Sequence, residues 1–371
     1  MKKNVRKINL FLSSILIVIS PNLNAQKDSS HSLLPSIKTM GFINVFYSYD
    51  FNQPDGNKRQ DFFFHHNRHN EFNLNMGLLQ VEVDHAKYRA KLGFQAGTYA
   101  NDNYAEEQDI FQNIYQANVG VALNKSNSLW LDAGIFESNL GFESALSIDN
   151  WTLSRALSSE SSPYYLAGAK LNYQTEKNWS FTALVSNGWQ RIQRIEGNSL
   201  LSFGSQITYE EKNRFLINWS TFVGTDDPDE QRRMRYFNNF YTKIYPLPKV
   251  SVLLGFDHGI QEESKNSSSN NYWYVYTFIT QYQLSDLWNM AFRAEYFQDD
   301  DELIIEAEEA MGFQTTSISF NLDYLPNNLT AIRLEGRWLT APSNTFLGAD
   351  GLESENFFIT ASIAMKLEHK H

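Results

Sequence analysis

Apolar and polar side chains alternate with a period of two along most of the chain after residue 40. The final segment is a clear case. Apolar residues occupy alternate positions from Phe357 to Leu367, and the positions between them include Thr360, Ser362 and Lys366. Successive side chains of a β-strand point to opposite faces, so each segment of this kind predicts a strand with one apolar and one polar face.

The pattern predicts 16 strands. They are Gly41–Phe51, Asn70–Asp84, Tyr88–Thr98, Phe111–Leu123, Leu129–Glu137, Tyr164–Gln174, Trp179–Gly188, Leu201–Tyr209, Arg214–Gly224, Arg235–Tyr245, Val250–His258, Asn271–Gln283, Trp288–Phe297, Phe313–Tyr324, Leu329–Thr340 and Phe357–Leu367. An even number of antiparallel strands places both ends of the chain at the same end of a closed sheet.

The gaps between these strands alternate between short and long. Asn124–Ser128 and Thr175–Asn178 have the length of tight turns, whereas Asn52–Asn70 and Ser138–Pro163 have the length of extended loops. Tight periplasmic turns and longer outer loops are typical of barrels in bacterial outer membranes. The sequence therefore predicts an all-β fold, a transmembrane antiparallel up-and-down β-barrel of about 16 strands with both termini periplasmic. A soluble β-sandwich would need a domain boundary and a β-solenoid a fixed repeat, and neither is evident.

Charged residues in the middle of predicted strands have to face the inside of such a barrel. An Arg or Lys at the lipid midplane costs roughly 2–4 kcal/mol, so a water-filled lumen is expected around these side chains. The predicted pore-lining residues are the bases Arg89, Lys91, Lys170, Arg214, Arg293, Arg333 and Arg337 and the acids Glu82, Asp132, Glu295 and Glu335. Opposed charges would tune ion preference. Alternatively, they pair with one another and stiffen the wall without selecting ions.

The longest internal gap, Ser138–Pro163, combines charged residues with apolar ones such as Leu140 and Phe142. A loop that only extended into water would not need these apolar anchors. We therefore predict that this third outer loop folds into the barrel and narrows it. A loop packed outside the barrel is the alternative. The residues assigned to the constriction are Glu143, Asp149, Trp151, Arg155 and Glu160.

The N-terminus has the features of a secretory signal peptide. Basic residues precede the apolar run Ile8–Ile19, and the small residue Ala25 marks a cleavage site. The run is too short to span a bilayer as a helix. The expected organisation is a signal peptide at 1–25, a periplasmic lead-in at 26–39 and an outer-membrane barrel at 40–371. Cleavage would change the net charge from −11 to about −15.

Composition argues against several functional classes. The 42 Asp and Glu outnumber the 31 Lys and Arg, and nucleic acid is an unsuitable partner because phosphate binding needs a basic face. The absence of cysteine excludes a thiolate nucleophile and a Cys-ligated metal. No Gly-x-Ser-x-Gly, His-Glu-x-x-His or phosphate-loop motif occurs. We therefore expect no enzyme activity, no catalytic residue and no cofactor.

Two clusters resemble metal sites only superficially. The acidic loop Gln298–Gly312 lacks the glycine of a calcium-binding EF-hand loop, and its charges would instead meet shared cations at the lipopolysaccharide surface. His65, His66 and His69 could bind a transition metal, but chance clustering on a loop surface is the favoured interpretation. We expect no dedicated metal site.

Four stretches, Leu129–Glu143, Asn150–Arg155, Pro163–Tyr173 and Phe72–Gln95, resemble the outer-membrane β-barrel porins common in Bacteroidetes-type bacteria. The resemblance implies a pore-forming porin fold without catalytic residues. One departure is the end of the chain, Met365–His371, which lacks the terminal aromatic residue that many outer-membrane barrels carry.

The expected function is passive diffusion of small hydrophilic solutes or ions, because a barrel near 16 strands is wide enough to keep an aqueous channel. Outer-membrane lipid and lipopolysaccharide are the other expected partners. A homotrimer is compatible with this strand number, although no interface is legible in the sequence. The alternative is a non-transport surface protein, either adhesin-like or a partner in a secretion complex.

Overall fold

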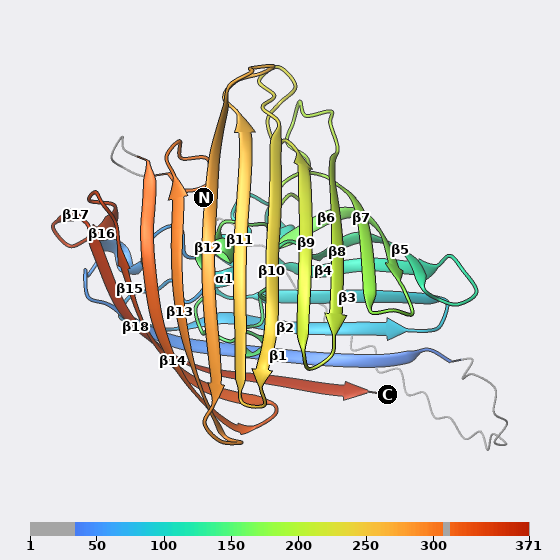
Figure 1. The fold of residues 1–371 in the computed structure, drawn as a ribbon, viewed down its shortest axis with the longest axis horizontal. Coiled ribbons are helices and arrows are strands. Elements are labelled where there is room, and N and C mark those ends of the chain that lie inside the picture. Colours follow the sequence, from blue (N-terminus) through green and yellow to red (C-terminus); the bar gives the residue numbers. More distant parts are fainter. Residues whose placement is uncertain (1–33, 307–311, 371) are drawn as a thin grey trace, which may run out of the picture. The chain divides into compact units, whose positions relative to one another are not determined.

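The computed structural model describes residues 34–306 and 312–370. Within them, 16 antiparallel strands close into a barrel (Figure 1). Each of these strands pairs with the next one along the chain, and β1 (Ser36–Asp50) closes the ring against β18 (Glu355–Lys370). The prediction of an antiparallel up-and-down β-barrel is confirmed.

The other strands of the barrel are β2 (Glu71–Asp84), β3 (Tyr88–Ala96), β4 (Ile114–Ala122), β5 (Leu129–Glu137), β6 (Tyr165–Gln174), β7 (Trp179–Ser186), β8 (Ser202–Glu211), β9 (Phe215–Gly224), β10 (Arg235–Leu247), β11 (Val250–Glu262), β12 (Asn270–Gln283), β13 (Trp288–Asp299), β14 (Phe313–Asn327) and β15 (Thr330–Thr340). A hairpin of β16 (Phe346–Gly348) and β17 (Gly351–Glu353), which the alternation did not predict, lies in the last loop. β1 begins at Ser36, ahead of its predicted start at Gly41. The predicted signal peptide, 1–25, lies outside the described residues.

One end of the barrel carries the short turns together with the start of β1 and the end of β18, because Lys38 pairs with Lys370. Three of these turns place an asparagine at positive φ, namely Asn127 at 55°, Asn178 at 64° and Asn213 at 61°. Asparagine tolerates this left-handed conformation better than most residues. Asparagine at these three turns therefore suits the backbone conformation that each turn requires.

The opposite end carries the long loops. They contain the described helices, which are α1 (Thr98–Asn103), α2 (Leu157–Glu160) and the single-turn 3-10 helices η1 (Asp55–Asn57), η2 (Asp109–Asn113) and η3 (Ser147–Asp149). Among the described residues, no helix has both the length and the apolar character needed to cross a membrane.

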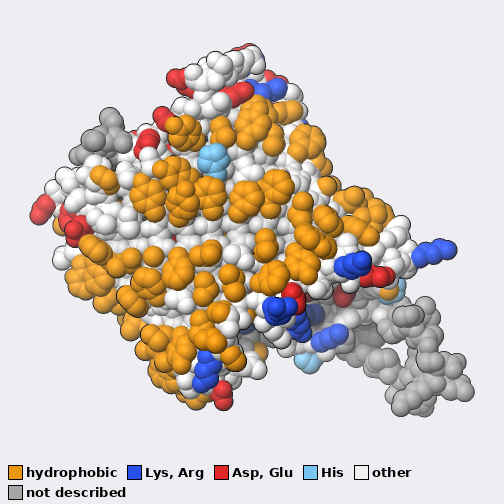
Figure 2. All heavy atoms as spheres, viewed as in Figure 1, with side chains coloured by type: hydrophobic (Ala, Val, Ile, Leu, Met, Phe, Trp, Pro, Cys, Tyr) orange, Lys and Arg blue, Asp and Glu red, His pale blue; other side chains and the backbone are white. Residues whose placement is uncertain are grey.

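The outer face of the barrel is apolar. On β12, Tyr272, Tyr276 and Phe278 are exposed, whereas Trp273 and Val275 between them are fully buried. Figure 2 shows hydrophobic side chains spread over the face formed by β10–β13. Such a surface is expected where lipid is the surrounding solvent. The alternation in the sequence therefore separates a lipid-facing set of side chains from an inward-facing set.

The inside of the barrel is partly filled. Near the long loops, inward residues such as Phe237, Trp273 and Phe358 pack against Phe63 and Leu157, which belong to loops. We expected water around all inward-facing charges, but loop segments cover many inward side chains of β10–β18 instead. The physical reason is that the free energy of the protein falls when apolar loop residues leave water and pack against these inward-facing rings.

Candidate functional site

The loop that follows β5, residues 138–164, crosses the interior of the barrel. Near its start, the carbonyl oxygen of Asn139 accepts hydrogen bonds from Gln206 on β8 and Ser220 on β9, both at 3.1 Å. Farther along, Asp149 forms an ion pair of 3.0 Å with Lys366 on β18. These strands stand on opposite sides of the closed ring. The loop therefore reaches from one wall to the other.

Arginine side chains of β13 and β15 hold the backbone of this loop. Their guanidinium groups donate to loop carbonyl oxygens, Arg333 to Ser147 (2.6 Å), Arg293 to Ser154 (2.7 Å) and Arg337 to Arg155 (2.9 Å). A guanidinium carries five N–H donors in a rigid fork, so one arginine can bind a carbonyl and a carboxylate at once. The three arginines use this capacity to join the wall to the loop.

The carboxylates on the same strands bind the other half of the loop backbone. Glu335 accepts a hydrogen bond from the N–H of Ser154 (2.5 Å), and Glu295 accepts one from the N–H of Leu157 (2.6 Å). The same carboxylates pair with arginines at 2.7 Å, Glu335 with Arg293 and Glu295 with Arg337. These side chains are at most 3% exposed. Predicted as pore-lining, they do face inward, together with Arg333, but the loop covers them.

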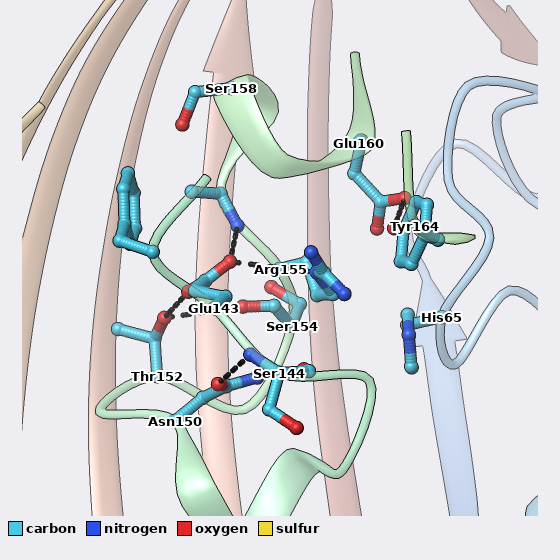
Figure 3. Close-up of polar contacts among 12 residues, drawn as sticks. His65, Glu143, Ser144, Asn150, Thr152, Ser154, Arg155, Ser158, Glu160 and Tyr164 are labelled. Atoms are coloured by element: carbon cyan, nitrogen blue, oxygen red, sulfur yellow. Dashed lines mark hydrogen bonds and ion pairs between the residues drawn. The ribbon is translucent and has the colours of Figure 1, made fainter. Parts of the chain in front are cut away.

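Polar contacts within the loop hold its shape (Figure 3). Glu143 accepts a hydrogen bond from the N–H of Ala156 (2.8 Å) and lies 3.7 Å from the guanidinium of Arg155. Arg155 in turn lies over the ring of Tyr164, 3.9 Å from its centre. The ring of Trp151 contacts an aromatic side chain of β10. The predicted constriction residues therefore belong to one folded loop, and their effect on conduction stays a prediction.

Glu160, at the end of α2, contacts Tyr164 (Figure 3) and connects this loop to the first outer loop. Its Oε2 accepts hydrogen bonds from the N–H of Phe64 (3.2 Å) and from the hydroxyl of Tyr164. Its Oε1 is buried without a hydrogen-bond partner among the described residues. Burial raises the pKa of this carboxyl to about 7, although the nearby Arg155 opposes the rise.

We expect Glu160 to make the stability of the barrel depend on pH. The folded pKa lies above the unfolded value, so the folded protein binds a proton more tightly, and stability rises as the pH falls from about 8 to about 5. Glu160→Gln keeps an acceptor and removes the charge, and it should flatten this part of the profile. Thermal unfolding in detergent across this pH range tests the expectation. Equal slopes in the two proteins would contradict it.

The first outer loop, residues 51–70, also lies inside the barrel, and the sequence analysis did not anticipate this. Arg59 is 1% exposed. Its guanidinium lies 3.6 Å from Asp50 and 3.4 Å from the centre of the Phe358 ring. The run Phe62–Phe64 could have predicted this inward position, because it supplies apolar anchors like those of the loop 138–164.

The histidines of this loop are structural. His65 bonds Asn75 (3.1 Å) and His66 bonds Asn44 (2.7 Å), and burial lowers the pKa of both rings well below the usual 6.5. They are therefore neutral and buried, and the expectation of a surface cluster is wrong. His69 accepts a hydrogen bond from a backbone N–H. Over residues 34–306 and 312–370, no group of three or more His, Cys, Asp or Glu is arranged to hold a metal.

The acidic loop after β13 is organised by its first carboxylate. Asp299 accepts hydrogen bonds from the backbone N–H groups of Leu303, Ile304 and Ile305, at 2.8–3.1 Å. The carboxylate of Asp299 therefore stabilises the backbone turn at the start of this loop. Residues 307–311 of this loop lie outside the described residues.

A different part of the wall faces an open cavity of about 530 Å³. Inward residues of β3–β8 line it, including the predicted pore-lining residues Arg89, Lys91, Asp132 and Lys170. The Arg89 side chain is 36% exposed and that of Lys91 is 40% exposed, and Lys91 pairs with Glu82 at 3.3 Å. The predicted lumen charges thus divide into a covered set on β13 and β15 and a set beside the open cavity on β2–β6, of which Asp132 is buried.

Arg214 belongs to neither set, which corrects its assignment to the pore. The strand predicted to begin at Arg214 begins at Phe215, so Arg214 lies in the turn at the short-turn end of the barrel. Its side chain is 70% exposed and pairs with Glu211. Arg214 occupies a position that would face inward if the strand continued to it. The alternation of side chains, however, sets their direction only within a strand.

The barrel matches one protein-family model, described as "Putative beta-barrel porin-2, OmpL-like", over residues 36–367. No curated protein matches the sequence. The match covers both inward loops and the ring of strands except the last three residues of β18.

Solved structures of outer-membrane channels share the fold. The anion-selective porin from Comamonas acidovorans is 7% identical, with 90% of this chain and 100% of that chain covered at a TM-score of 0.60. The channel DcaP of Acinetobacter baumannii is 12% identical, with 90% and 97% covered at a TM-score of 0.58. OmpT of Vibrio cholerae in its trimer form is 9% identical, with 90% and 100% covered at a TM-score of 0.55. At these identities the likeness concerns the fold.

Proposed function

We propose a function from one premise: this chain belongs to the family of OmpL-like β-barrel porins. It is an outer-membrane porin that forms a channel. The finer proposal is that the channel is water-filled and passes small hydrophilic solutes or ions by passive diffusion. The cavity of about 530 Å³ beside β3–β8 carries this proposal, because solutes inside it would meet partly exposed charged side chains.

The loop 138–164 is the proposed constriction. It crosses the interior and is bound to β13 and β15 through buried charges, so solutes have to pass between it and the opposite wall. This arrangement supports a static narrowing. Covered arginines cannot meet a passing ion, and selection therefore falls to the open charges on β2–β6.

The proposed orientation follows from the two unlike ends of the barrel. The end with short turns and chain termini would face the periplasm after export by the signal peptide, and the long loops would meet lipopolysaccharide. Assembly as a homotrimer is also proposed. Its support is the trimer form of the structurally similar OmpT of Vibrio cholerae.

Conductance tests this function directly. Purified protein in planar lipid bilayers should give discrete current steps whose size increases with salt concentration, as a water-filled pore requires. A reversal potential under a KCl gradient then gives the ion preference. Silence under several lipid and salt conditions would contradict the channel and favour the non-transport surface protein.

A further inference from the structure

The ammonium of Lys170 lies inside the barrel without a direct ionic partner among the described residues. Lys170 on β6 lines the cavity of about 530 Å³, and its Nζ lies 4.2 Å from the centre of the Phe136 ring. Within the described part of the chain, its ammonium forms no ion pair within 4 Å and no hydrogen bond. An aromatic face compensates an ammonium less well than a carboxylate does. Lys170 is therefore able to bind an anion.

The acid nearest to Lys170 in the sheet is already bound by other groups. Asp132 stands opposite Lys170 in the pairing of β5 with β6. Its carboxylate accepts two hydrogen bonds from Arg89 (2.6 and 2.5 Å) and one from Asn172 (2.6 Å). Asp132 therefore has little capacity left for the ammonium.

Gly120 makes this pairing possible. It stands between Arg89 and Asp132 on β4, and a Cβ at this position would lie 2.2 Å from Oδ1 of Asp132. Any other residue would force Arg89 or Asp132 to move. The glycine thus lets Arg89 reach across a strand and take the carboxylate that Lys170 would otherwise bind.

Two other acids on this side of the barrel accept hydrogen bonds as well. Glu82 pairs with Lys91 and accepts a hydrogen bond from Gln80 (2.7 Å). Glu137 accepts hydrogen bonds from the hydroxyl of Tyr115 and from Gln116 (3.0 Å). Lys170 is therefore a cation of this cavity that no carboxylate contacts directly, although the charges of Asp132 and Glu137 lie in the same cavity.

We propose that Lys170 is the centre of a subsite for small organic carboxylates on the solute route. The proposal rests on the proposed function and names its solute class. A bound carboxylate would give Lys170 a direct ionic partner, because Arg89 and Lys91 already hold the carboxylates of Asp132 and Glu82. The rings of Phe136 and Trp130, which line the cavity, provide apolar surface for the rest of the solute.

Calorimetry of the purified barrel in detergent tests binding apart from conduction. Sodium benzoate is the probe, and benzamide is a neutral molecule of the same shape. Lys170→Gln removes the charge in the cavity. Lys177→Gln removes the same charge from the exposed turn between β6 and β7 and serves as the matched control. Block of bilayer current by benzoate provides the second readout.

We expect wild type and Lys177→Gln to bind benzoate in preference to benzamide. Lys170→Gln should bind benzoate about tenfold more weakly, the loss of one charge-assisted hydrogen bond. Equal benzoate binding by Lys170→Gln and Lys177→Gln, or none by wild type, would overturn the subsite even if current steps persist. Benzoate binding that depends on Lys170 in a protein without current steps would keep the subsite and overturn the channel.

Discussion

Replacing Arg293 by methionine is expected to destabilise the barrel by about 3–5 kcal/mol, the cost of breaking a buried charge pair from one side. Arg293 and Glu335 are both fully buried and lie 2.7 Å apart. Methionine fills a similar volume but leaves the carboxylate of Glu335 without this partner. The change also removes the hydrogen bond from Arg293 to the carbonyl oxygen of Ser154, which holds the crossing loop. Unfolding by guanidinium in lipid vesicles measures the loss.

The matched control is Arg214→Met, the same substitution at a side chain that is 70% exposed. Its pair with Glu211 is in water, and exposed pairs contribute only about 0–1 kcal/mol. A similar loss of stability in the two variants would show that the charges beneath the loop are not buried in the folded protein, contrary to their position in the barrel.

Deleting residues 139–162 and joining the ends with a short glycine–serine linker is expected to raise single-channel conductance several-fold. The deletion removes the segment that crosses from β8–β9 to β18. Water would then reach the charges of β13 and β15, which can still pair with one another. Shortening the exposed loop between β11 and β12 at residues 264–268 is the control, because that loop lies outside the ring and should leave conductance unchanged. Unchanged conductance after the first deletion would contradict the constriction.

A second variant tests the position of the loop without removing it. The hydroxyl oxygens of Ser158 on α2 and Thr277 on β12 lie 3.2 Å apart. The chain has no cysteine, so Ser158→Cys with Thr277→Cys introduces a single pair of thiols. Oxidation should join them and leave conductance at the wild-type level, because the loop already stands there. Failure to form the disulfide in a folded barrel would indicate that α2 does not lie beside β12.

The strands were predictable because lipid outside the barrel and polar groups inside it impose opposite demands on neighbouring residues. On β15, Ile332 and Leu334 face outward, whereas Arg333 and Glu335 face inward, and this difference is written directly in the sequence. The crossing of the loop 138–164 was predictable from its apolar anchors. The same argument applied to Phe62–Phe64 would have placed the first outer loop inside as well.

The partners of the inward charges were not predictable. Arg89 and Arg293 occupy equivalent positions in the alternation, yet Arg89 lines an open cavity and Arg293 is fully covered. The difference depends on which strands the loop 138–164 contacts inside the barrel, and it contacts β13 and β15. The role of Gly120 is equally invisible, because it depends on side chains from two neighbouring strands that meet above it.

The sequence by itself determined the ring of strands, its two unlike ends and the inward direction of most charged side chains, because a period of two separates lipid-facing from inward-facing residues locally. Only the tertiary structure decided which charges are paired beneath loops and which remain open to solutes. That division depends on contacts between residues far apart in the chain, such as Ser154 with Glu335 and Asn139 with Gln206. No local pattern records these contacts.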